Sequence, residues 1–436
     1  MLWAECAKAQ SWINVGTAGF SDGRVRYTNI ACDTGGTPYV VYEDMANGYK
    51  ATVKKYNGSS WVIVGSAGFS ADTATFTSMA IDRSGSPYVV YKDVMDSGKV
   101  TVMKYNGSSW VTVGSRGFSG WGANSPSIAL DTSGIPYVVY EDGSHIDSAI
   151  VMKYNGSSWI TVGGAAVSAG PAESTSIAID RSNIPYVVYR DDVDSLKATV
   201  MKFNGSGWVV VGSAGFSAGE VYSTTIAIDS AGTPYVAYTD GADSNKATVM
   251  KYNGSSWVAI GSAGFSAGGA QWTDIAIYNG VPYVSYEDNA DSYKATVMKY
   301  NGSNWVTVGS AGFSAGPAIF MSMALDRNGT PYVVYEDVAD SGRATVMKFD
   351  TATTTLINSM GESVVTSISL FPNPTQKELT VTSSDPITSV LIGNVLGQTL
   401  YTLRSNDQVH VDVSDLPAGV YLIKINGTEV RKFVKQ

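Results

Sequence analysis

The sequence predicts an all-β protein, and two observations support that prediction. A strand-rich unit of about 49 residues recurs seven times, and a strand-rich segment of different character follows the last unit. Repeats of this length are typical of solenoids and propellers. One tryptophan marks each unit: Trp12, Trp61, Trp110, Trp159, Trp208, Trp257 and Trp305. One Pro-Tyr pair keeps the same rhythm, beginning at Pro38, Pro87, Pro136, Pro185, Pro234, Pro282 and Pro331.

Each unit contains four short strand signals that turn residues separate. In the fifth unit they read TTIAID, PYVAYTD, KATVMKYNG and WVAIG, which are rich in Val, Ile, Thr and Tyr. Four antiparallel strands per unit, repeated seven times, predict a seven-bladed β-propeller over residues 11–350. The alternative is a β-solenoid, which would have shorter units and parallel stacking.

The two ends of the repeat region predict how the ring of blades closes. The chain starts with an outer strand at 11–16, whereas the seventh unit stops after its third strand at 344–350. We therefore expect residues 11–16 to pair with residues 344–349 and to complete the seventh blade. The sixth unit is one residue shorter than the others, and Asn279-Gly280 supplies a tight hairpin turn there.

The recurring residues are expected to form the scaffold, and the variable residues to carry recognition. Each tryptophan should pack into its blade, and the aspartate of turns such as IDRSG should accept N–H groups of its own turn. Turns of the D-x-x-G and NGSS types share one face, while the hairpins after YED and the long crossovers share the other. The second face varies among units, which is where binding sites usually lie.

Acidic residues on the variable face allow two interpretations. An aspartate and a basic residue six positions later, such as Asp44 and Lys50, flank most hairpins after YED and are placed to pair across the loop base. The alternative, which the sequence favours, is a solvated hairpin without this pair. Asp191, Asp192 and Asp194 form the densest carboxylate cluster, which makes them the weak candidates for a calcium site.

A column of aromatic residues stands just before the inner strand of several units. Ser125 and Ser174 occupy this column in the third and fourth units, and Trp121 and Tyr222 lie four and one positions ahead of it. Aromatic faces stack on sugar rings or bases, and the mouth of a central channel is concave. The alternative is that these residues plug the channel or cover the strand ends. The candidate ligand-binding residues are Tyr27, Phe76, Trp121, Tyr222, Trp272 and Phe320.

Charge and composition exclude several partners and cofactors. A net charge of -9 argues against nucleic acid and against an anionic membrane. No apolar run of about 18 residues exists, so no transmembrane segment is predicted. Only two histidines are present, His145 and His410, in different regions. A histidine-based zinc site and a Ser-His-Asp triad are therefore excluded, and no cofactor is predicted apart from the calcium candidate.

The chain changes character after Asp350. Residues 351–366 lack the repeat and are expected to be a linker, and residues 367–436 contain alternating strand signals with turn punctuation. The second segment contains a Phe-Pro-Asn-Pro run at 371–374, a Gly-Gln turn at 397–398, a Leu-Pro-Ala-Gly-Val-Tyr run at 416–421 and a basic end.

These motifs stand in the same order in the type A C-terminal sorting domain of the Bacteroidota type IX secretion system, which the segment resembles. The resemblance implies a small β-sandwich, the secretion machinery as a partner of residues 367–436, and a secreted or outer-membrane surface-attached protein. The residues that match the sorting motif are Pro372, Asn373, Pro374, Gly397, Gly419, Tyr421, Lys432 and Lys435.

The N-terminus is expected to be what remains of an export signal. Residues 1–10 are too short for a charged start plus an apolar core, but Ala7-Lys8-Ala9 has the small-x-small pattern of a signal peptide end. The repeats themselves resemble the repetitive β-propellers of secreted Bacteroidota proteins, and this resemblance implies no particular activity.

Three classes of function fit the sequence. The first is a secreted or cell-surface module that binds carbohydrate or another extracellular polymer, and the second is a scaffold for protein–protein contacts. The third is a propeller glycosidase or lyase, which needs two carboxylates about 5–10 Å apart across a cleft. Glu173, Glu220 and Asp274 lie near the predicted mouth, but nothing in the sequence pairs them. The sequence therefore favours binding over catalysis.

Overall fold

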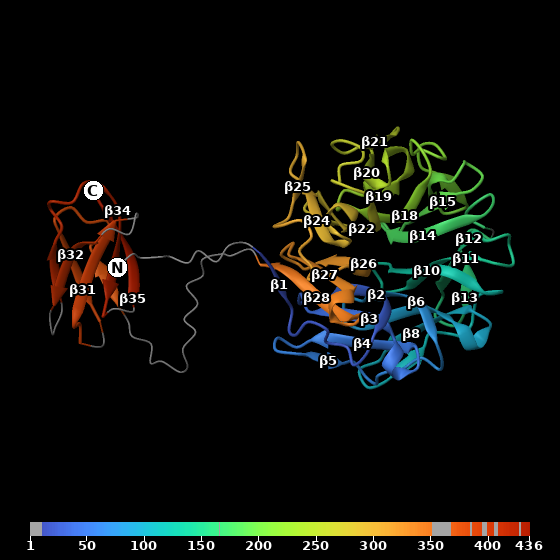
Figure 1. Ribbon diagram of the computed structural model, residues 1–436, viewed down its shortest axis with the longest axis horizontal. Coiled ribbons are helices and arrows are strands. Elements are labelled where there is room, and N and C mark those ends of the chain that lie inside the picture. The colour runs from blue at the N-terminus through green and yellow to red at the C-terminus, as the bar shows by residue number, and fades with distance from the viewer. Residues whose placement is uncertain are drawn as a thin grey trace. The chain divides into compact units, whose positions relative to one another are not determined.

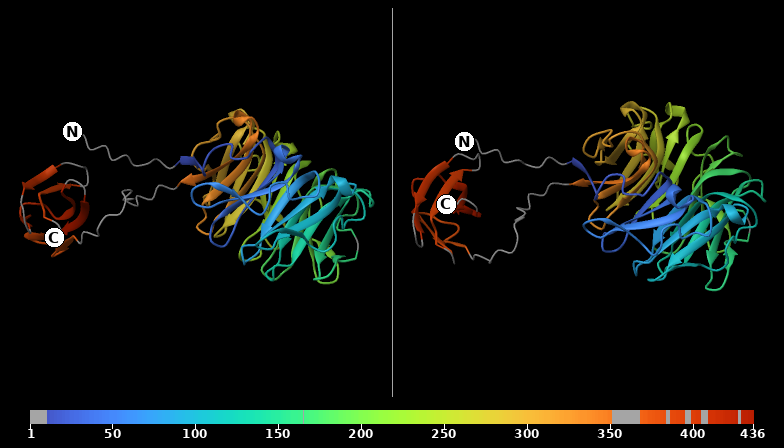
Figure 2. Two further views of the ribbon diagram at one scale, coloured as in Figure 1. Left: turned by 90° about the horizontal axis from the view of Figure 1, so that it is seen from below. Right: turned by 60° about the horizontal axis from the view of Figure 1, so that its bottom comes forward.

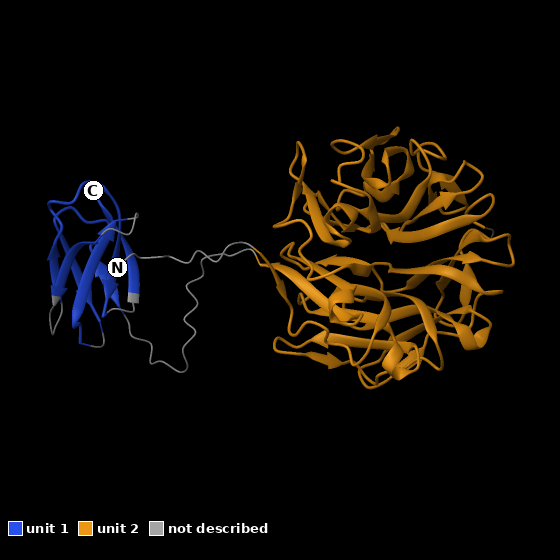
Figure 3. Ribbon diagram, viewed as in Figure 1, with its two compact units in different colours: residues 1–9, 352–436 blue, residues 10–351 orange. Residues whose placement is uncertain are grey.

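The structure is a computed structural model, and it describes residues 11–164, 166–350, 368–383, 386–394, 399–404, 409–426 and 429–436. The chain divides into two compact units, one within residues 10–351 and the other within residues 352–436 (Figure 3). The expected signal-peptide remnant at 1–10 lies outside the described residues.

The repeats form seven four-stranded antiparallel sheets, consistent with propeller blades, which lie around a common centre (Figure 1). We number the sheets 1 to 7 in the order of their inner strands. The inner strands are β2 (Val25–Cys32), β6 (Ala74–Ile81), β10 (Ala123–Leu130), β14 (Ala172–Ile179), β18 (Val221–Ile228), β22 (Ala270–Tyr278) and β26 (Ala318–Leu325). The second strands are β3 (Pro38–Asp44), β7 (Pro87–Asp93), β11 (Pro136–Asp142), β15 (Pro185–Asp191), β19 (Pro234–Asp240), β23 (Val281–Asp288) and β27 (Pro331–Asp337).

The outer half of each sheet is equally regular, and Figure 2 shows the same sheets from two further sides. The third strands are β4 (Lys50–Tyr56), β8 (Lys99–Tyr105), β12 (Ser148–Tyr154), β16 (Lys197–Phe203), β20 (Lys246–Tyr252), β24 (Lys294–Tyr300) and β28 (Arg343–Asp350). The outer strands of sheets 1 to 6 are β5 (Trp61–Ile63), β9 (Trp110–Thr112), β13 (Trp159–Thr161), β17 (Trp208–Val210), β21 (Trp257–Ala259) and β25 (Trp305–Thr307).

The second strands are buried along most or all of their length because both of their faces pack against a neighbouring sheet. All seven residues of β27 are buried, for example. Between sheets 5 and 6, Tyr235 and Ala237 pack against Ile275 and Val284. This arrangement explains why the PYVVYED segments are almost continuously apolar instead of alternating.

The N-terminal strand completes sheet 7, as predicted. In β1 (Ser11–Asn14), Trp12 lies opposite Phe349 of β28. The indole N–H of Trp12 donates to the carbonyl of Val308 at 2.7 Å, and that of Trp61 donates to the carbonyl of Val15 at 2.6 Å. The start of the chain is therefore hydrogen-bonded to the last repeat, to the sixth sheet's end and to the first sheet's outer strand.

The tryptophans connect neighbouring sheets, which confirms their scaffold role. In every unit the indole N–H donates to a carbonyl just after the preceding outer strand, as Trp257 does to Val211 at 2.7 Å. A phenylalanine of the crossover stacks on the indole, with 4.4 Å between the ring centroids of Phe216 and Trp257. Trp208 lacks this stack because Val167 occupies the phenylalanine position.

The turns confirm one prediction and correct another. Asp33 accepts N–H groups of its own turn from Gly35 and Thr37, and the equivalent aspartates do the same. Asp44 does not pair with Lys50, because its buried carboxylate accepts hydrogen bonds from Ala46, Asn47 and Thr52 of its own hairpin instead. The short 3-10 helices after these aspartates are η1 (Met45–Asn47), η2 (Val94–Asp96), η3 (Gly241–Asp243), η4 (Asn289–Asp291) and η5 (Val338–Asp340).

The C-terminal unit contains two antiparallel sheets. Leu379 and Val411 from one sheet and Ile392 and Phe433 from the other belong to a single buried cluster. None of the helices within the described ranges is long and apolar enough to cross a membrane. One sheet has the order β29 (Ser369–Phe371), β30 (Glu378–Thr382), β33 (Val409–Asp412), and the other has the order β32 (Thr399–Arg404), β31 (Ser389–Asn394), β34 (Gly419–Ile425), β35 (Glu429–Lys435).

Candidate functional site at the channel mouth

A cavity of ≈ 330 Å³ lies at the centre of the seven sheets, and each inner strand contributes three consecutive residues to its wall. The first of the three, which we call the mouth position, is Tyr27, Phe76, Ser125, Ser174, Ser223, Trp272 or Phe320. The third, the channel position, is Asn29, Ser78, Ser127, Ser176, Thr225, Asp274 or Ser322. All seven sheets therefore build one site.

A local backbone feature turns the mouth residues toward the cavity. Each inner strand has a register shift against its neighbour at this point, as between Arg26 and Asn29 of β2. All seven mouth residues have φ between 44° and 53°, the left-handed region that side-chain-bearing residues rarely adopt. Such a residue costs of order 1–3 kcal/mol, and strained positions of this kind cluster at functional sites.

The residue between the mouth and channel positions links neighbouring sheets. In five sheets it is a threonine whose hydroxyl donates to the carbonyl of the preceding sheet's mouth residue, as Thr224 does to Ser174 at 2.5 Å. Pro126 and Met321 occupy the other two positions and have no hydroxyl. These latch threonines hold the mouth backbone in place whatever the mouth side chain is.

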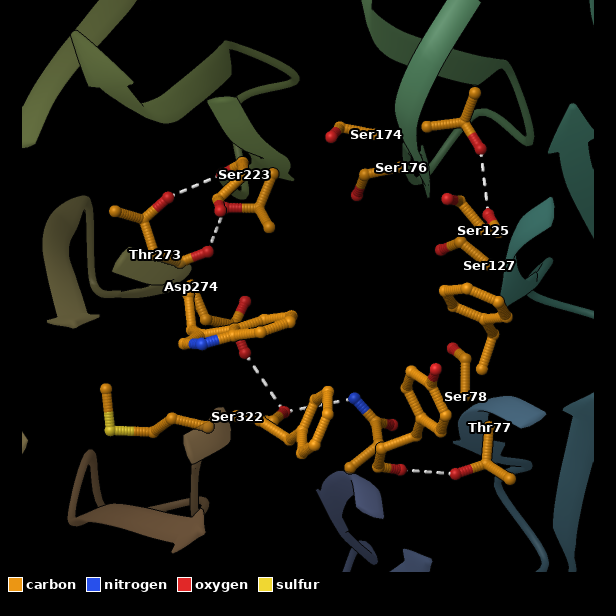
Figure 4. A pocket seen from close by; sticks show the side chains of 18 of the residues that line it. Thr77, Ser78, Ser125, Ser127, Ser174, Ser176, Ser223, Thr273, Asp274 and Ser322 are labelled. Atoms are coloured by element: carbon orange, nitrogen blue, oxygen red, sulfur yellow. Dashed lines mark hydrogen bonds between the residues drawn. The ribbon is translucent and has the colours of Figure 1, made fainter. Parts of the chain in front are cut away.

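The mouth has an aromatic half and a hydroxyl half. Trp272, Phe320, Tyr27 and Phe76 form a continuous arc, in which adjacent ring centroids lie 4.6 to 4.8 Å apart. We call these four residues the aromatic arc. Ser125, Ser174 and Ser223 complete the circle and form the serine arc. Figure 4 shows the serine hydroxyls and the Asp274 carboxylate around the open space.

Asp274 is the one carboxylate among the described residues that line this cavity. It accepts N–H groups of Ile275 and Met323 at 2.9 Å each and the hydroxyl of Ser322 at 3.0 Å. Burial raises the pKa of Asp274, and these three donors oppose that effect. A carboxylate has about four acceptor positions, and these three donors occupy three of them.

A second set of polar residues lies one layer behind the mouth. These backing positions precede the last aspartate of each second strand. Three of their side chains bond to the next sheet's inner strand: Glu141 accepts the N–H of Ser174 at 3.0 Å, Thr239 donates to the carbonyl of Ala270 at 2.7 Å, and Lys92 donates to the side chain of Asn124 at 2.7 Å. The seven backing residues are Glu43, Lys92, Glu141, Arg190, Thr239, Glu287 and Glu336.

The buried glutamates of this set titrate unusually. Burial is the largest cause that raises the pKa of Glu43, Glu141 and Glu287 to about 7, and burial also raises the pKa of Glu336 despite its ion pair with Arg24. One carboxylate oxygen of Glu43 and one of Glu336 have no hydrogen-bond partner in the described part of the chain.

The structure brings four of the six predicted ligand-binding residues together. Tyr27, Phe76, Trp272 and Phe320 all line the cavity, whereas Trp121 and Tyr222 do not. Trp121 is 68% exposed on its crossover, and the ring of Tyr222 lies 5.0 Å from the guanidinium of Arg190. Of the channel positions the sequence pointed only to Asp274, and it pointed to none of the backing positions, although their regular spacing is visible once the register of the sheets is known.

Apart from Asp274, the acidic residues considered for catalysis or calcium binding do not line the cavity. Glu173 pairs with Arg190, and neither Glu173 nor Glu220 lines the cavity with Asp274. Asp191 accepts the N–H of Val193 at 3.2 Å and so caps its own turn. Among the described residues, no group of three or more His, Cys, Asp or Glu side chains has the arrangement of a metal site.

The sorting-motif residues of the C-terminal unit pack around its last strand. The side chain of Asn373 accepts the N–H of Val434 at 2.9 Å and donates to the carbonyl of Lys432 at 3.2 Å. The Tyr421 hydroxyl donates to the carbonyl of Pro417 at 2.8 Å, and Gly419 lies opposite Lys435. Pro372 and Pro374 flank Asn373, and Gly397 lies outside the described residues.

These features define a repeat protein with a central polar-aromatic cavity and a separate C-terminal β unit. Residues 369–436 match the family of secretion system C-terminal sorting domains. The chain therefore carries a type IX secretion sorting domain, which implies secretion and interaction with the secretion machinery. No curated protein matches the chain in sequence.

Solved structures are similar in fold at low sequence identity. A fungal alcohol oxidase in complex with copper is 13% identical, with a TM-score of 0.52 over 97% of this chain and 100% of that one. PorZ, a surface component of the type IX secretion system of Porphyromonas gingivalis, is 15% identical, with a TM-score of 0.50 over 95% of this chain and 60% of PorZ. The Aleuria aurantia lectin is 17% identical, with a TM-score of 0.43 over 69% of this chain and 100% of that one.

Proposed function

We propose that this protein is a secreted binding module that takes a carbohydrate at the mouth of a closed seven-bladed β-propeller. In this proposal the propeller spans residues 11–350, a linker spans 351–366, and a β-sandwich at 367–436 directs export. The observation that carries the proposal is the division of the mouth into an aromatic arc and a serine arc around one cavity.

The chemistry of the two arcs suits a sugar ring. A pyranose has an apolar face that stacks on aromatic rings, and its hydroxyls need donors and acceptors at the edge. The aromatic arc supplies the first, while the serine arc and Asp274 supply the second. The volume of ≈ 330 Å³ lies at the small end of the range for ligand pockets, about 300–1,000 Å³. The cavity therefore has room for a short saccharide segment.

The absence of a second carboxylate disfavours a glycosidase at this site. Asp274 stands alone among the described lining residues, whereas glycosidases use two carboxyl groups about 5–10 Å apart. A protein–protein scaffold is the second candidate function. It is favoured by apolar side chains that are more than 60% exposed on loops of sheets 2 to 4: Met95, Trp121, Ile146 and Val193.

A glycan array probed with the full chain tests the proposal. We expect a defined set of glycans to bind, and Phe76→Ala and Trp272→Ala to weaken that binding by ~1–3 kcal/mol each, as the loss of an aromatic stacking platform does. Tyr293→Ala is the matched control, because Tyr293 is 48% exposed on a hairpin away from the cavity. Binding that is indifferent to both mouth substitutions contradicts the proposal.

Export is tested separately with a reporter. A reporter fused to residues 351–436 behind a signal peptide should leave the periplasm only where a type IX translocon is present. Removal of residues 431–436 should retain the fusion in the periplasm, because the Asn373 side chain and β34 both bond to this last strand. Normal export of the truncated fusion would show that residues 431–436 are not part of the sorting signal.

A further inference from the structure

The aromatic arc coincides with a concentration of carboxylates. Glu141 of sheet 3 contacts the mouth residue Ser174 of sheet 4. The equivalent positions pair Glu287 with Phe320, Glu336 with Tyr27 and Glu43 with Phe76. The fourth arc residue, Trp272, is followed two positions later by Asp274 in the cavity wall. The carboxylates that accompany the aromatic arc are therefore Glu287, Glu336, Glu43 and Asp274.

The serine arc has a different electrostatic background. Lys92 occupies the backing position of Ser125, and its ammonium donates to the side chain of Asn124 at 2.7 Å. Arg190 occupies the backing position of Ser223, and its guanidinium lies over the ring of Tyr222. Lys92 and Arg190 thus lie behind two of the three serines, with Arg190 also paired to Glu173, and Glu141 lies behind the third. The backing positions are therefore more acidic behind the aromatic arc than behind the serine arc.

The nearby cations only partly neutralise the acidic half. Arg24 pairs with Glu336 at 2.7 Å, and Arg26 lies opposite Glu43 in the sheet. No described ion pair involves Glu287 or Asp274. Glu336 and Glu43 each face one arginine, whereas Glu287 and Asp274 face none. Burial raises the pKa of all four carboxyl groups, to about 7 for Glu43 and Glu287, so a cation in the mouth would favour their ionised forms. The faces of the aromatic rings also attract cations. Aromatic faces backed by carboxylates are a favourable environment for an ammonium group.

We propose that the mouth recognises a saccharide that bears a free, positively charged amine, with the ammonium against the aromatic arc and Asp274 and the ring hydroxyls against the serine arc. This inference rests on the proposed function and names its substrate class. The remaining acceptor position of Asp274 receives one ammonium N–H, and the buried glutamates stabilise the charge from behind the rings.

Calorimetric titration of the full chain with three matched oligosaccharides tests this assignment. The probes are β-1,4-linked trimers of glucosamine, of N-acetylglucosamine and of glucose, which differ only at the second carbon of each ring. At pH 7 the glucosamine trimer should bind at least ~10-fold more tightly than either neutral trimer, and this preference should shrink as salt is added.

Two substitutions connect the preference to the carboxylates. Asp274→Asn should reduce the preference for the amine over the neutral trimers by ~10-fold, beyond any loss of affinity that all three trimers share. Glu287→Gln tests the same point without touching a group that binds backbone N–H groups, so it remains informative if Asp274→Asn fails to fold. Glu141→Gln is the matched control: it has the same register and similar burial, but it lies behind the serine arc, and it should leave the preference unchanged.

The outcomes separate this inference from the proposed function. Equal affinity for the amine and acetylated trimers overturns the inference and leaves a neutral carbohydrate site. Failure of every glycan on the array to bind overturns both. A lysine amide that binds as tightly as the glucosamine trimer also overturns the inference, because the site would then recognise the ammonium without the sugar.

Discussion

The outer-strand tryptophans and the mouth residues are two columns with the same sevenfold spacing, yet they differ in one respect. The tryptophan is present in all seven units, whereas the mouth position contains two phenylalanines, one tyrosine, one tryptophan and three serines. Both columns connect neighbouring sheets, but through different atoms. The tryptophan uses its side-chain N–H, and the mouth residue uses its backbone carbonyl.

This difference explains why one column is constant and the other varies. The bond from Trp257 to Val211 requires an indole, so its replacement removes both the hydrogen bond and the stacked ring. The latch from Thr224 to the Ser174 carbonyl uses no atom of the Ser174 side chain. Where the scaffold uses only the backbone, the side chains remain available for recognition.

The largest expected loss of stability follows from deleting the N-terminal strand. Deletion of residues 1–17 removes β1, with the Trp12 ring and its bond to Val308, and exposes the edge of β28. Loss of the buried tryptophan alone costs ~3–5 kcal/mol, and an unpaired strand edge promotes aggregation. Thermal unfolding with light scattering should show a lower midpoint and aggregation. An unchanged midpoint without aggregation would mean that β1 does not tie the repeats together.

The seven tryptophans should not contribute equally to stability, and Trp208 should contribute less than Trp257. Trp257 stacks on Phe216, whereas Trp208 has no phenylalanine from its crossover. Trp208→Ala should therefore destabilise the protein less than Trp257→Ala, by the ~0.5–1.5 kcal/mol that an aromatic pair contributes beyond burial. Urea unfolding of both variants measures the difference. Equal losses would show that the stacked phenylalanine contributes nothing.

The latch threonines should contribute a smaller amount each. Thr224→Val keeps the side-chain shape and removes the hydroxyl that bonds to Ser174, so the free energy of unfolding should fall by ~0.5–1.5 kcal/mol. Met321→Leu is the control, because that position has no hydroxyl in the native chain. If the valine variant matches the control, the hydrogen bonds from the latch threonines to the mouth carbonyls do not stabilise the fold.

The buried glutamates predict a pH dependence of stability. The pKa of Glu43, Glu141 and Glu287 is raised to about 7, above the usual 4.5, so the folded chain binds more protons than the unfolded chain between these values. These groups therefore lower stability progressively as the pH rises from about 4.5 to about 7, and the effect levels off above that. Glu287→Gln should reduce this decline in a series of thermal unfolding midpoints. A decline of the same size in the variant would exclude Glu287 as a cause.

Much of this fold could be predicted from the sequence because the same pattern of strands and turns recurs in seven units. The four strands per unit, the role of the tryptophans, the turn aspartates and the Asn279-Gly280 turn all follow from spacing and turn chemistry. Asp44 does not pair with Lys50, and charge spacing could not show this, because it does not reveal that the carboxylate is buried and bonded to Thr52. The backing glutamates were missed because their partners lie one sheet further along the chain.

The central claim is that mouth side chains carry recognition while outer-strand tryptophans carry stability. Trp272→Ala and Trp257→Ala test it most directly, with ligand affinity and the free energy of unfolding measured on both. We expect Trp272→Ala to lose ~1–3 kcal/mol of binding and about 1 kcal/mol or less of stability. Trp257→Ala should lose ~3–5 kcal/mol of stability, and its folded fraction should still bind. If Trp272→Ala unfolds the protein as severely as Trp257→Ala, the mouth is part of the scaffold and the account is contradicted.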